Sequence, residues 1–212
     1  MDFHSFQKLI AKIQQSPLIG DEAHFLMAPI ERRVPLNNYQ SENYKPKIAA
    51  VNILFYPKNN QTHVLFIKRT ADQSVHSGQI AFPGGKKDAV DSHEKITALR
   101  ELHEEVGILN HQIEVIHQLT PLYIPPSNFE VYPFVSYAQN PLYFKLQKQE
   151  VADILEIPLA YLLSDEAIDE ITLNTSYVKE IKFPVFKWHD HVIWGATAMI
   201  FSEIREMILR LK

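Results

Sequence analysis

One stretch of this chain, residues 84–108, constrains its fold more than any other. It opens with two adjacent glycines, continues through a polar segment with helical periodicity, and closes at Gly107. Asp91 or Ser92 is predicted to cap the start of this helix by accepting hydrogen bonds from exposed backbone amides. Gly107 is predicted to end it, because glycine adopts the left-handed conformation of a helix C-terminus at little cost. The stretch therefore predicts a glycine loop that leads directly into a capped helix.

The predicted helix has two unlike faces. Its apolar residues recur at four-residue steps and indicate a stripe that packs into a core: Ala98, Leu102 and Val106. Glu101 and Glu105 also lie four residues apart, with Glu104 beside them, and like charges at this spacing disfavour a helix by about 0.2 to 0.5 kcal/mol per pair. Carboxylates of this kind are typical ligands of Mg²⁺, together with water and substrate phosphates. Two interpretations stay open from the residues alone, an exposed charged face and a site for a divalent cation.

The residues before this helix favour the second interpretation. Gly84 and Gly85 allow the backbone to approach a ligand without obstruction, although paired glycines also mark ordinary turns. Lys68 and Arg69 end a predicted strand close to this loop, where their cations could contact phosphate. The alternative for both basic residues is a solvated strand end.

The segment from Arg100 to Ile108, Arg-Glu-Leu-His-Glu-Glu-Val-Gly-Ile, resembles the second half of the Nudix box, and Gly85 matches its opening glycine. In that box a glutamate follows the glycine by six positions, and an arginine follows the glutamate by eight. Here Asp91 holds the glutamate position, with Glu94 as an alternative, and Arg100 comes one residue late. The resemblance implies a hydrolase with the Nudix-type α/β/α sandwich and a mixed β-sheet.

Residues upstream resemble the signature of the coenzyme A pyrophosphatase branch of that family. Arg69, Gly78 and residues 82–85 match in register, whereas Thr70 replaces a small residue and Ser74 replaces a second arginine. The resemblance implies hydrolysis of coenzyme A or acyl-coenzyme A to 3′,5′-ADP and (acyl-)4′-phosphopantetheine. Because Ser74 removes a cation, ADP-ribose or another nucleoside diphosphate derivative stays open as the substrate. A non-catalytic ligand sensor is a third alternative, opposed by the complete Arg-Glu and Glu-Glu pairs.

The resemblance also implies roles for individual residues. Glu101 and Glu105, with Glu104, would hold Mg²⁺ or Mn²⁺, which would screen phosphate charge and activate water. Glu104 or Glu150 would take the proton of the attacking water, since Glu150 matches an acidic position that lies before a strand in this family. Arg100 is predicted to orient the carboxylates rather than to touch the substrate. Gly84 and Gly85 join Lys68 and Arg69 as the expected substrate-binding residues.

Composition narrows the class of protein. The chain has 212 residues, of which 46% are hydrophobic and 22% charged, and this predicts one domain, with two small domains as the alternative. The resemblance implies a Nudix core over residues 47–212, preceded by an N-terminal helix and lead-in over residues 1–46. A net charge of -4 argues against a general nucleic-acid binder. The absence of cysteine excludes disulfides, cysteine nucleophiles and thiolate metal sites.

No segment predicts a membrane or export role. Residues 1–15 lack the apolar run of a signal peptide, and the longest apolar region, residues 192–201, is too short to span a bilayer. We therefore expect a cytoplasmic protein whose partner is a small molecule, with neither a nucleic acid nor a membrane as partner. A homodimer is compatible with the sequence.

Periodicity and turn residues predict the remaining elements. An amphipathic helix is expected over residues 3–15, an extended lead-in over 16–46, and a closing helix over 196–211. The predicted strands cover residues 47–56, 63–68, 79–82, 113–123, 131–137, 154–158, 177–188 and 192–194, with a short helix over 159–163. His189 and His191 flank Asp190 in a tight turn, where adjacent side chains point different ways, so a metal site is not expected there.

Overall fold

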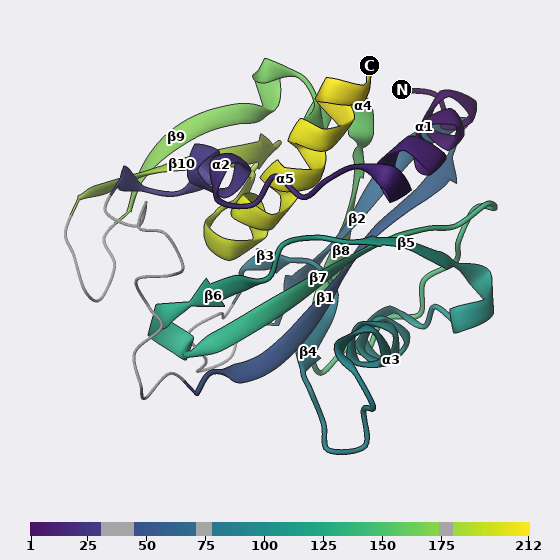
Figure 1. Cartoon of the computed structure of the whole chain (residues 1–212), viewed down its shortest axis with the longest axis horizontal. Helices are drawn as coiled ribbons and strands as arrows, with labels where there is room; N and C mark the ends of the chain where they lie inside the picture. The colour runs from purple at the N-terminus through teal and green to yellow at the C-terminus, as the bar shows by residue number, and fades with distance from the viewer. Residues whose placement is uncertain (31–44, 71–77, 174–179) are drawn as a thin grey trace.

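A mixed β-sheet forms the middle layer of the structure, a computed structural model that describes residues 1–30, 45–70, 78–173 and 180–212 (Figure 1). Helix α3 (Glu94–Val106) covers one face of this sheet. Helices α1 (Phe3–Gln15) and α5 (Gly195–Leu211) cover the opposite face. The predicted α/β/α sandwich with a mixed sheet is confirmed.

The sheet is mixed because its two central strands run parallel while their neighbours run antiparallel. Five strands follow one another in the order β3 (Ile80–Ala81), β2 (Gln61–Arg69), β1 (Lys47–Lys58), β7 (Phe129–Tyr137) and β5 (Glu114–Gln118). Strands β1 and β7 form the parallel pair. Three further strands pair with members of this path from outside it: β4 (Gly84–Lys86) with β1, β6 (Leu122–Ile124) with β7 and β8 (Val151–Pro158) with β2. A separate antiparallel sheet contains β9 (Ile168–Leu173), β10 (Ile181–Trp188) and β11 (His191–Ile193).

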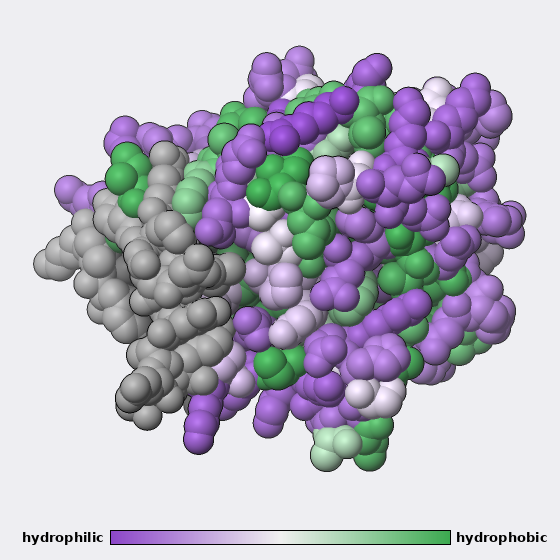
Figure 2. Space-filling view, viewed as in Figure 1, coloured by the Kyte–Doolittle hydropathy of each residue, from purple (hydrophilic) through white to green (hydrophobic). Residues whose placement is uncertain are grey.

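The central sheet divides the hydrophobic core into two parts. Successive side chains of a strand point to opposite faces, and β1 follows this rule. Ile53 and Phe55 pack with α1 and α5 in the larger cluster, whereas Leu54 and Tyr56 pack against α3. The apolar stripe predicted on α3 is buried as expected: Ala98, Leu102 and Val106. Hydrophilic residues cover most of the face in Figure 2, with apolar residues in small groups between them.

The predicted elements differ from the structure in three places. The lead-in is not wholly extended, because α2 (Asp21–His24) and the 3₁₀ helix η1 (Phe25–Met27) form within it; residues 31–44 lie outside the described chain. The strand predicted over residues 113–123 is two strands, β5 and β6. Strands β4 and β9 were not predicted. Short helices make up the other connections: η4 (Asn110–Gln112), η5 (Pro125–Ser127), α4 (Leu159–Leu162) and η6 (Asp165–Ala167).

Glu203 of α5 explains both the folded lead-in and the break between β5 and β6. Its Oε1 accepts the N–H groups of Ile19 at 3.0 Å and Gly20 at 2.9 Å, and the Thr120 hydroxyl at 2.7 Å. Its Oε2 accepts the Thr120 N–H at 3.0 Å and lies 3.3 Å from Nε2 of His24. Burial opposes ionisation, but the contact with His24 and the hydrogen bonds from Gly20 and Thr120 outweigh it and lower the pKa of Glu203 to about 2.

Replacing Glu203 with glutamine is expected to destabilise the fold at pH 7 by about 2 to 4 kcal/mol, because an amide NH₂ would face backbone N–H groups. The folded pKa of Glu203 lies below its ordinary value of 4.5. Its contribution is therefore present above about pH 4.5 and is lost as the pH falls towards 2. Urea unfolding of both proteins at pH 7 and pH 3 measures this, and we expect the gap between them to narrow at pH 3. A gap that is independent of pH would contradict the assignment.

Candidate active site

Helix α3 ends as the sequence predicts but begins differently. Gly107 adopts a left-handed φ of 77° and donates its N–H to the carbonyl oxygen of His103 at 2.8 Å, which confirms the predicted C-terminal cap. The predicted N-terminal caps, Asp91 and Ser92, are wrong. His93 occupies the cap position and makes no side-chain cap bond.

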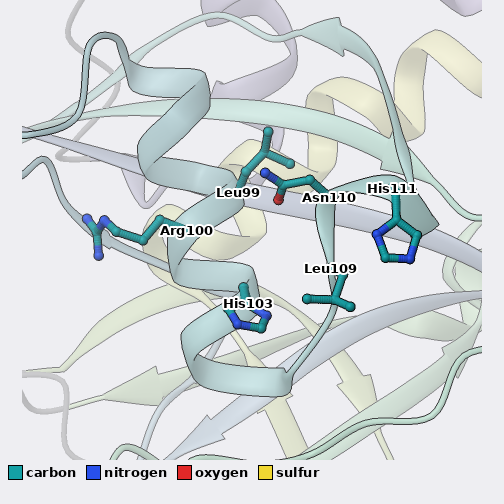
Figure 3. Close-up of a pocket in the computed structure, with 6 residues that line it drawn as sticks. All are labelled: Leu99, Arg100, His103, Leu109, Asn110 and His111. Carbon is teal, nitrogen blue, oxygen red and sulfur yellow. The ribbon is translucent and has the colours of Figure 1, made fainter.

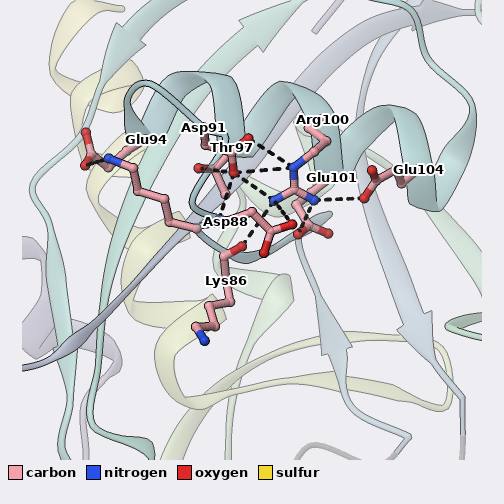
Figure 4. Close-up of polar contacts among 9 residues, drawn as sticks. Lys86, Asp88, Asp91, Glu94, Thr97, Arg100, Glu101 and Glu104 are labelled. Atoms are coloured by element: carbon pink, nitrogen blue, oxygen red, sulfur yellow. Dashed lines mark hydrogen bonds and ion pairs between the residues drawn. The ribbon is translucent and has the colours of Figure 1, made fainter.

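Asp91 is not a cap because its buried carboxylate is used elsewhere (Figure 4). Its Oδ2 accepts the Thr97 hydroxyl at 3.0 Å and Nη2 of Arg100 at 2.9 Å. The hydrogen bond from Arg100 holds the pKa of Asp91 at about 2. Glu94, the alternative for the first acidic position, instead accepts Nζ of Lys87 at 2.9 Å. The structure therefore places Asp91, and not Glu94, against Arg100.

Arg100 connects the loop before α3 with the acidic face of the helix. Its Nη1 donates to Oε1 of Glu101 at 2.9 Å and to Oε2 of Glu104 at 2.8 Å. Its Nη2 also donates to the carbonyl oxygen of Lys86 at 3.1 Å (Figure 4). A planar guanidinium with five N–H donors suits several acceptors at fixed angles. These contacts fit the predicted orienting role, which remains a prediction.

The glycine loop lies directly against the acidic face. The Gly84 N–H donates to Oε2 of Glu105 at 2.8 Å. A Cβ atom at Gly85 would lie 2.4 Å from Oε1 of Glu101, and one at Gly84 would lie 2.4 Å from the carbonyl oxygen of Ala50. Gly84 requires glycine because the backbone of β1 approaches it so closely, whereas a side chain at Gly85 would displace the Glu101 carboxylate. The Gly84 N–H is thus bonded to the protein's own carboxylate.

Glu105 is the most unusual group in this region. It is buried, and its Oε1 has no hydrogen-bond partner. Burial raises the pKa of Glu105 to about 8, against the opposing effects of the Gly84 N–H and the positive charge of Arg69. Burial likewise raises the pKa of Glu101, and the negative charge of Glu150 adds to both shifts. A buried carboxylate oxygen without a hydrogen bond is costly, and it offers a position for a cation.

Glu101 and Glu105 therefore fit a divalent cation, with water and phosphate oxygens as further ligands, as is common for Mg²⁺. Glu104 lies beside Glu101, because Nη1 of Arg100 donates to both carboxylates, but no contact among the described residues joins it to Glu105. Its side chain is 53% exposed and is turned to Arg100, because residues 104 and 105 point about 100° apart around the helix. Within the described ranges, no three acidic or histidine side chains converge on one metal position, and this includes His189 and His191.

Glu150 reaches the same region from the turn before β8. The Gln147 N–H donates to the carbonyl oxygen of Glu105 at 2.9 Å, which satisfies one of the free carbonyls at the end of α3. The Thr70 N–H donates to the carbonyl oxygen of Glu150 at 3.0 Å. This turn is therefore attached both to α3 and to the end of β2, with the Glu150 side chain exposed. Its catalytic role stays a prediction.

The two basic residues at the end of β2 lie on opposite faces of the sheet. Arg69 comes two residues after Ile67, which packs on the α3 side, so both side chains lie on that face. Its Nη1 lies 3.8 Å from Oε1 of Glu105. Lys68 comes two residues after Phe66, which packs on the α5 side, so both side chains lie on that opposite face. The structure therefore brings Arg69, but not Lys68, to the carboxylates. Ser74 lies outside the described residues.

A separate open depression of about 320 Å³ lies on another side of α3 (Figure 3). Its lining residues are Leu99, Arg100, His103, Leu109, Asn110 and His111. The Arg100 side chain extends away from the other five residues. Because its guanidinium belongs to the contacts with Asp91 and Glu101, this depression is distinct from the carboxylate site.

Comparisons with known proteins match the part of the chain that contains these residues. The family model described as the NUDIX domain matches residues 46–188. A Photorhabdus laumondii protein named uncharacterized Nudix hydrolase NudL is 32% identical over 169 residues, which cover 79% of this chain and 87% of that protein. A protein of the same name from Yersinia enterocolitica is 34% identical over 146 residues, covering 68% of this chain and 73% of the relative.

Structural comparison agrees with the fold. A Nudix hydrolase from M. smegmatis, RenU, superposes with a TM-score of 0.54 at 17% identity, covering 79% of this chain and 88% of that one. At this identity the likeness concerns the fold alone. None of the described helices is both long and apolar enough to cross a membrane.

Proposed function

Because the chain belongs to the Nudix family of hydrolases, we propose that it cleaves the pyrophosphate bond of coenzyme A or an acyl-coenzyme A with Mg²⁺ or Mn²⁺. The products would be 3′,5′-ADP and (acyl-)4′-phosphopantetheine. One contact supports this proposal above the others. The hydrogen bond from the Gly84 N–H to Glu105, at 2.8 Å, ties the Phe-Pro-Gly-Gly motif of the coenzyme A branch to the acidic helix.

The chain's own groups suit this reaction. Glu101 and Glu105 would hold the cation, with Oε1 of Glu105 as an available oxygen. A divalent cation bound there would screen the charge of the pyrophosphate and activate water. Arg100 would keep Glu101 in position through Nη1. The partly exposed side chain of Arg69, on the same side of the sheet, would contact a phosphate oxygen through its guanidinium.

The proton of the attacking water needs an acceptor. Water adds to one phosphorus atom while the bridging oxygen leaves with the other phosphate, and a general base takes the proton. We favour Glu150 over Glu104 for this step. Glu104 is paired with Arg100, whereas the described residues include no base within ion-pair distance of Glu150. Glu104 was expected either as a further ligand of the cation or as the general base. With Glu150 as the base, only the ligand role remains open for Glu104.

The proposal also covers the setting of the reaction. Residues 47–212 would form one Nudix core in the cytoplasm, preceded by the N-terminal helix and lead-in of residues 1–46. A homodimer is compatible with it. ADP-ribose or another nucleoside diphosphate derivative is the second candidate substrate, because Ser74 stands where the coenzyme A branch has an arginine.

Product analysis tests the proposal. The purified protein is incubated with coenzyme A and Mg²⁺ or Mn²⁺, beside ADP-ribose and beside a Glu105→Gln variant. We expect 3′,5′-ADP from coenzyme A, dependent on the cation and absent with the variant. Cleavage of ADP-ribose alone would keep the chemistry and overturn the substrate. Failure to cleave either substrate would favour the non-catalytic ligand sensor.

A further inference from the structure

Arg69 lies beside the carboxylate oxygen that the proposed cation would use. Its Nη1 is 3.8 Å from Oε1 of Glu105, a distance within the range of an ion pair but too long for a hydrogen bond. That oxygen is buried and makes no hydrogen bond. Among the described residues, Arg69 is the only base within ion-pair distance of Glu105. The guanidinium is thus the counter-charge of Glu105 without being bonded to it.

From this contact we propose that Arg69 and the divalent cation exchange places at Oε1 of Glu105. While no cation is bound, Arg69 supplies the positive charge that faces Oε1 of Glu105, and it leaves when the cation arrives. Its guanidinium then becomes available to a phosphate oxygen of the substrate. This inference rests on the proposed function, since it uses the same cation and the same carboxylate.

The surroundings of Arg69 permit such a movement. Its backbone N–H is bonded to the carbonyl oxygen of Gln79 at 3.0 Å, so the strand itself is held. Its side chain is 31% exposed, and therefore has a path into solvent. The positive charge of the guanidinium would repel a divalent cation at Oε1 of Glu105, and this repulsion favours the departure of Arg69.

Arg100 provides the contrast. Its guanidinium donates to Asp91, Glu101 and Glu104 and to the carbonyl oxygen of Lys86, at distances between 2.8 and 3.3 Å. Those contacts fix the Arg100 guanidinium against the loop and the acidic face. Arg69 has a single long contact with the same group of acids. Arg100 is therefore held in place by several hydrogen bonds, whereas Arg69 can exchange with the cation.

Direct cation binding tests this exchange. The protein without substrate is titrated with Mn²⁺, and free Mn²⁺ is followed by electron paramagnetic resonance. We expect Arg69→Met to bind Mn²⁺ about tenfold more tightly than the wild type, because a repelling charge is gone. Arg69 also favours ionisation of Glu105, but the cation carries twice the charge of a proton, so the loss of repulsion is the larger effect. At saturating Mn²⁺ the same variant is expected to have a kcat/KM for coenzyme A about tenfold lower, because the phosphate contact is lost.

Two further variants serve as controls. Arg69→Lys keeps the positive charge and should bind Mn²⁺ within about twofold of the wild type. Lys68→Met removes the same charge one residue away on the other face of the sheet, and should leave the Mn²⁺ affinity within about twofold because salt screens it. Thermal unfolding of each variant verifies that it is folded.

The outcomes separate this inference from the proposed function. Tighter Mn²⁺ binding with weaker catalysis in Arg69→Met supports the exchange. If the wild type binds Mn²⁺ and Arg69→Met binds it equally or more weakly, the exchange is overturned and the proposed function stands. If neither protein binds Mn²⁺, the cation site itself is wrong, and the proposed function is overturned with it.

Discussion

Replacing Glu105 with glutamine is expected to lower kcat/KM for the pyrophosphate substrate by about three orders of magnitude. Glutamine keeps an acceptor for the Gly84 N–H, but it removes the charge with which Oε1 would hold the cation. Weakening that cation site should cost about 4 kcal/mol of transition-state stabilisation. The measurement is steady-state kinetics with Mn²⁺ and coenzyme A. Glu104→Gln is the matched control, and because Glu104 is turned to Arg100, we expect a loss of only about tenfold.

The same variant should be at least as stable as the wild type without metal. The folded pKa of Glu105, about 8, lies above its ordinary value of 4.5, so the folded protein retains a proton that the unfolded chain releases between these values. Wild-type stability therefore falls as the pH rises through this window, and the variant escapes that loss. Urea unfolding in a chelator should give the variant an advantage that grows from pH 5 to pH 8. An advantage that shrinks over this range would contradict the environment assigned to Glu105.

Replacing Arg100 with lysine is expected to reduce kcat/KM by about 100-fold and to destabilise the fold by about 2 to 3 kcal/mol. A lysine cannot donate to Asp91, Glu101 and Glu104 at once. Because Asp91 is buried, its carboxylate would lose most of the hydrogen bonding that offsets the cost of its burial. Kinetics and urea unfolding measure the two effects. Arg210→Lys provides the control, since Arg210 forms an exposed ion pair with Glu22 and should change neither quantity by much. Wild-type activity in Arg100→Lys would remove the orienting role.

Local periodicity predicted the parts of the fold that depend on nearby residues. The apolar stripes of α1, α3 and α5 predicted those helices, and alternation predicted β1 and β2. Strand β4 was missed because Gly84 and Gly85 have no preference for strand structure, and it forms only because β1 offers a partner. The lead-in and the β5–β6 break were missed because both depend on Glu203, far away in the sequence.

The candidate site can likewise be divided into features that nearby residues predict and features that local rules miss. Glu101, Glu105 and Arg100 lie within one helix, so helical spacing predicted which of them share a face. The cap predicted at Asp91 was wrong because its carboxylate accepts hydrogen bonds from Arg100 and Thr97 instead of capping the helix. No spacing argument indicated Thr97 as a partner of Asp91. Gln147 was missed for a different reason. It supports α3 through a backbone N–H, which nearly every residue carries, so its side chain gives no signal.

The division of the core by the central sheet has a consequence for how this chain can vary. Glu203 lies on α5 and Glu105 on α3, on opposite faces of the sheet. Changes at separated sites with no shared partners usually have additive effects on stability. Substitutions in the lead-in and α5 can then accumulate with little epistasis towards the α3 face of the sheet, which carries the candidate site. A lineage could gain stability on one face and use it to tolerate a destabilising change of substrate preference on the other.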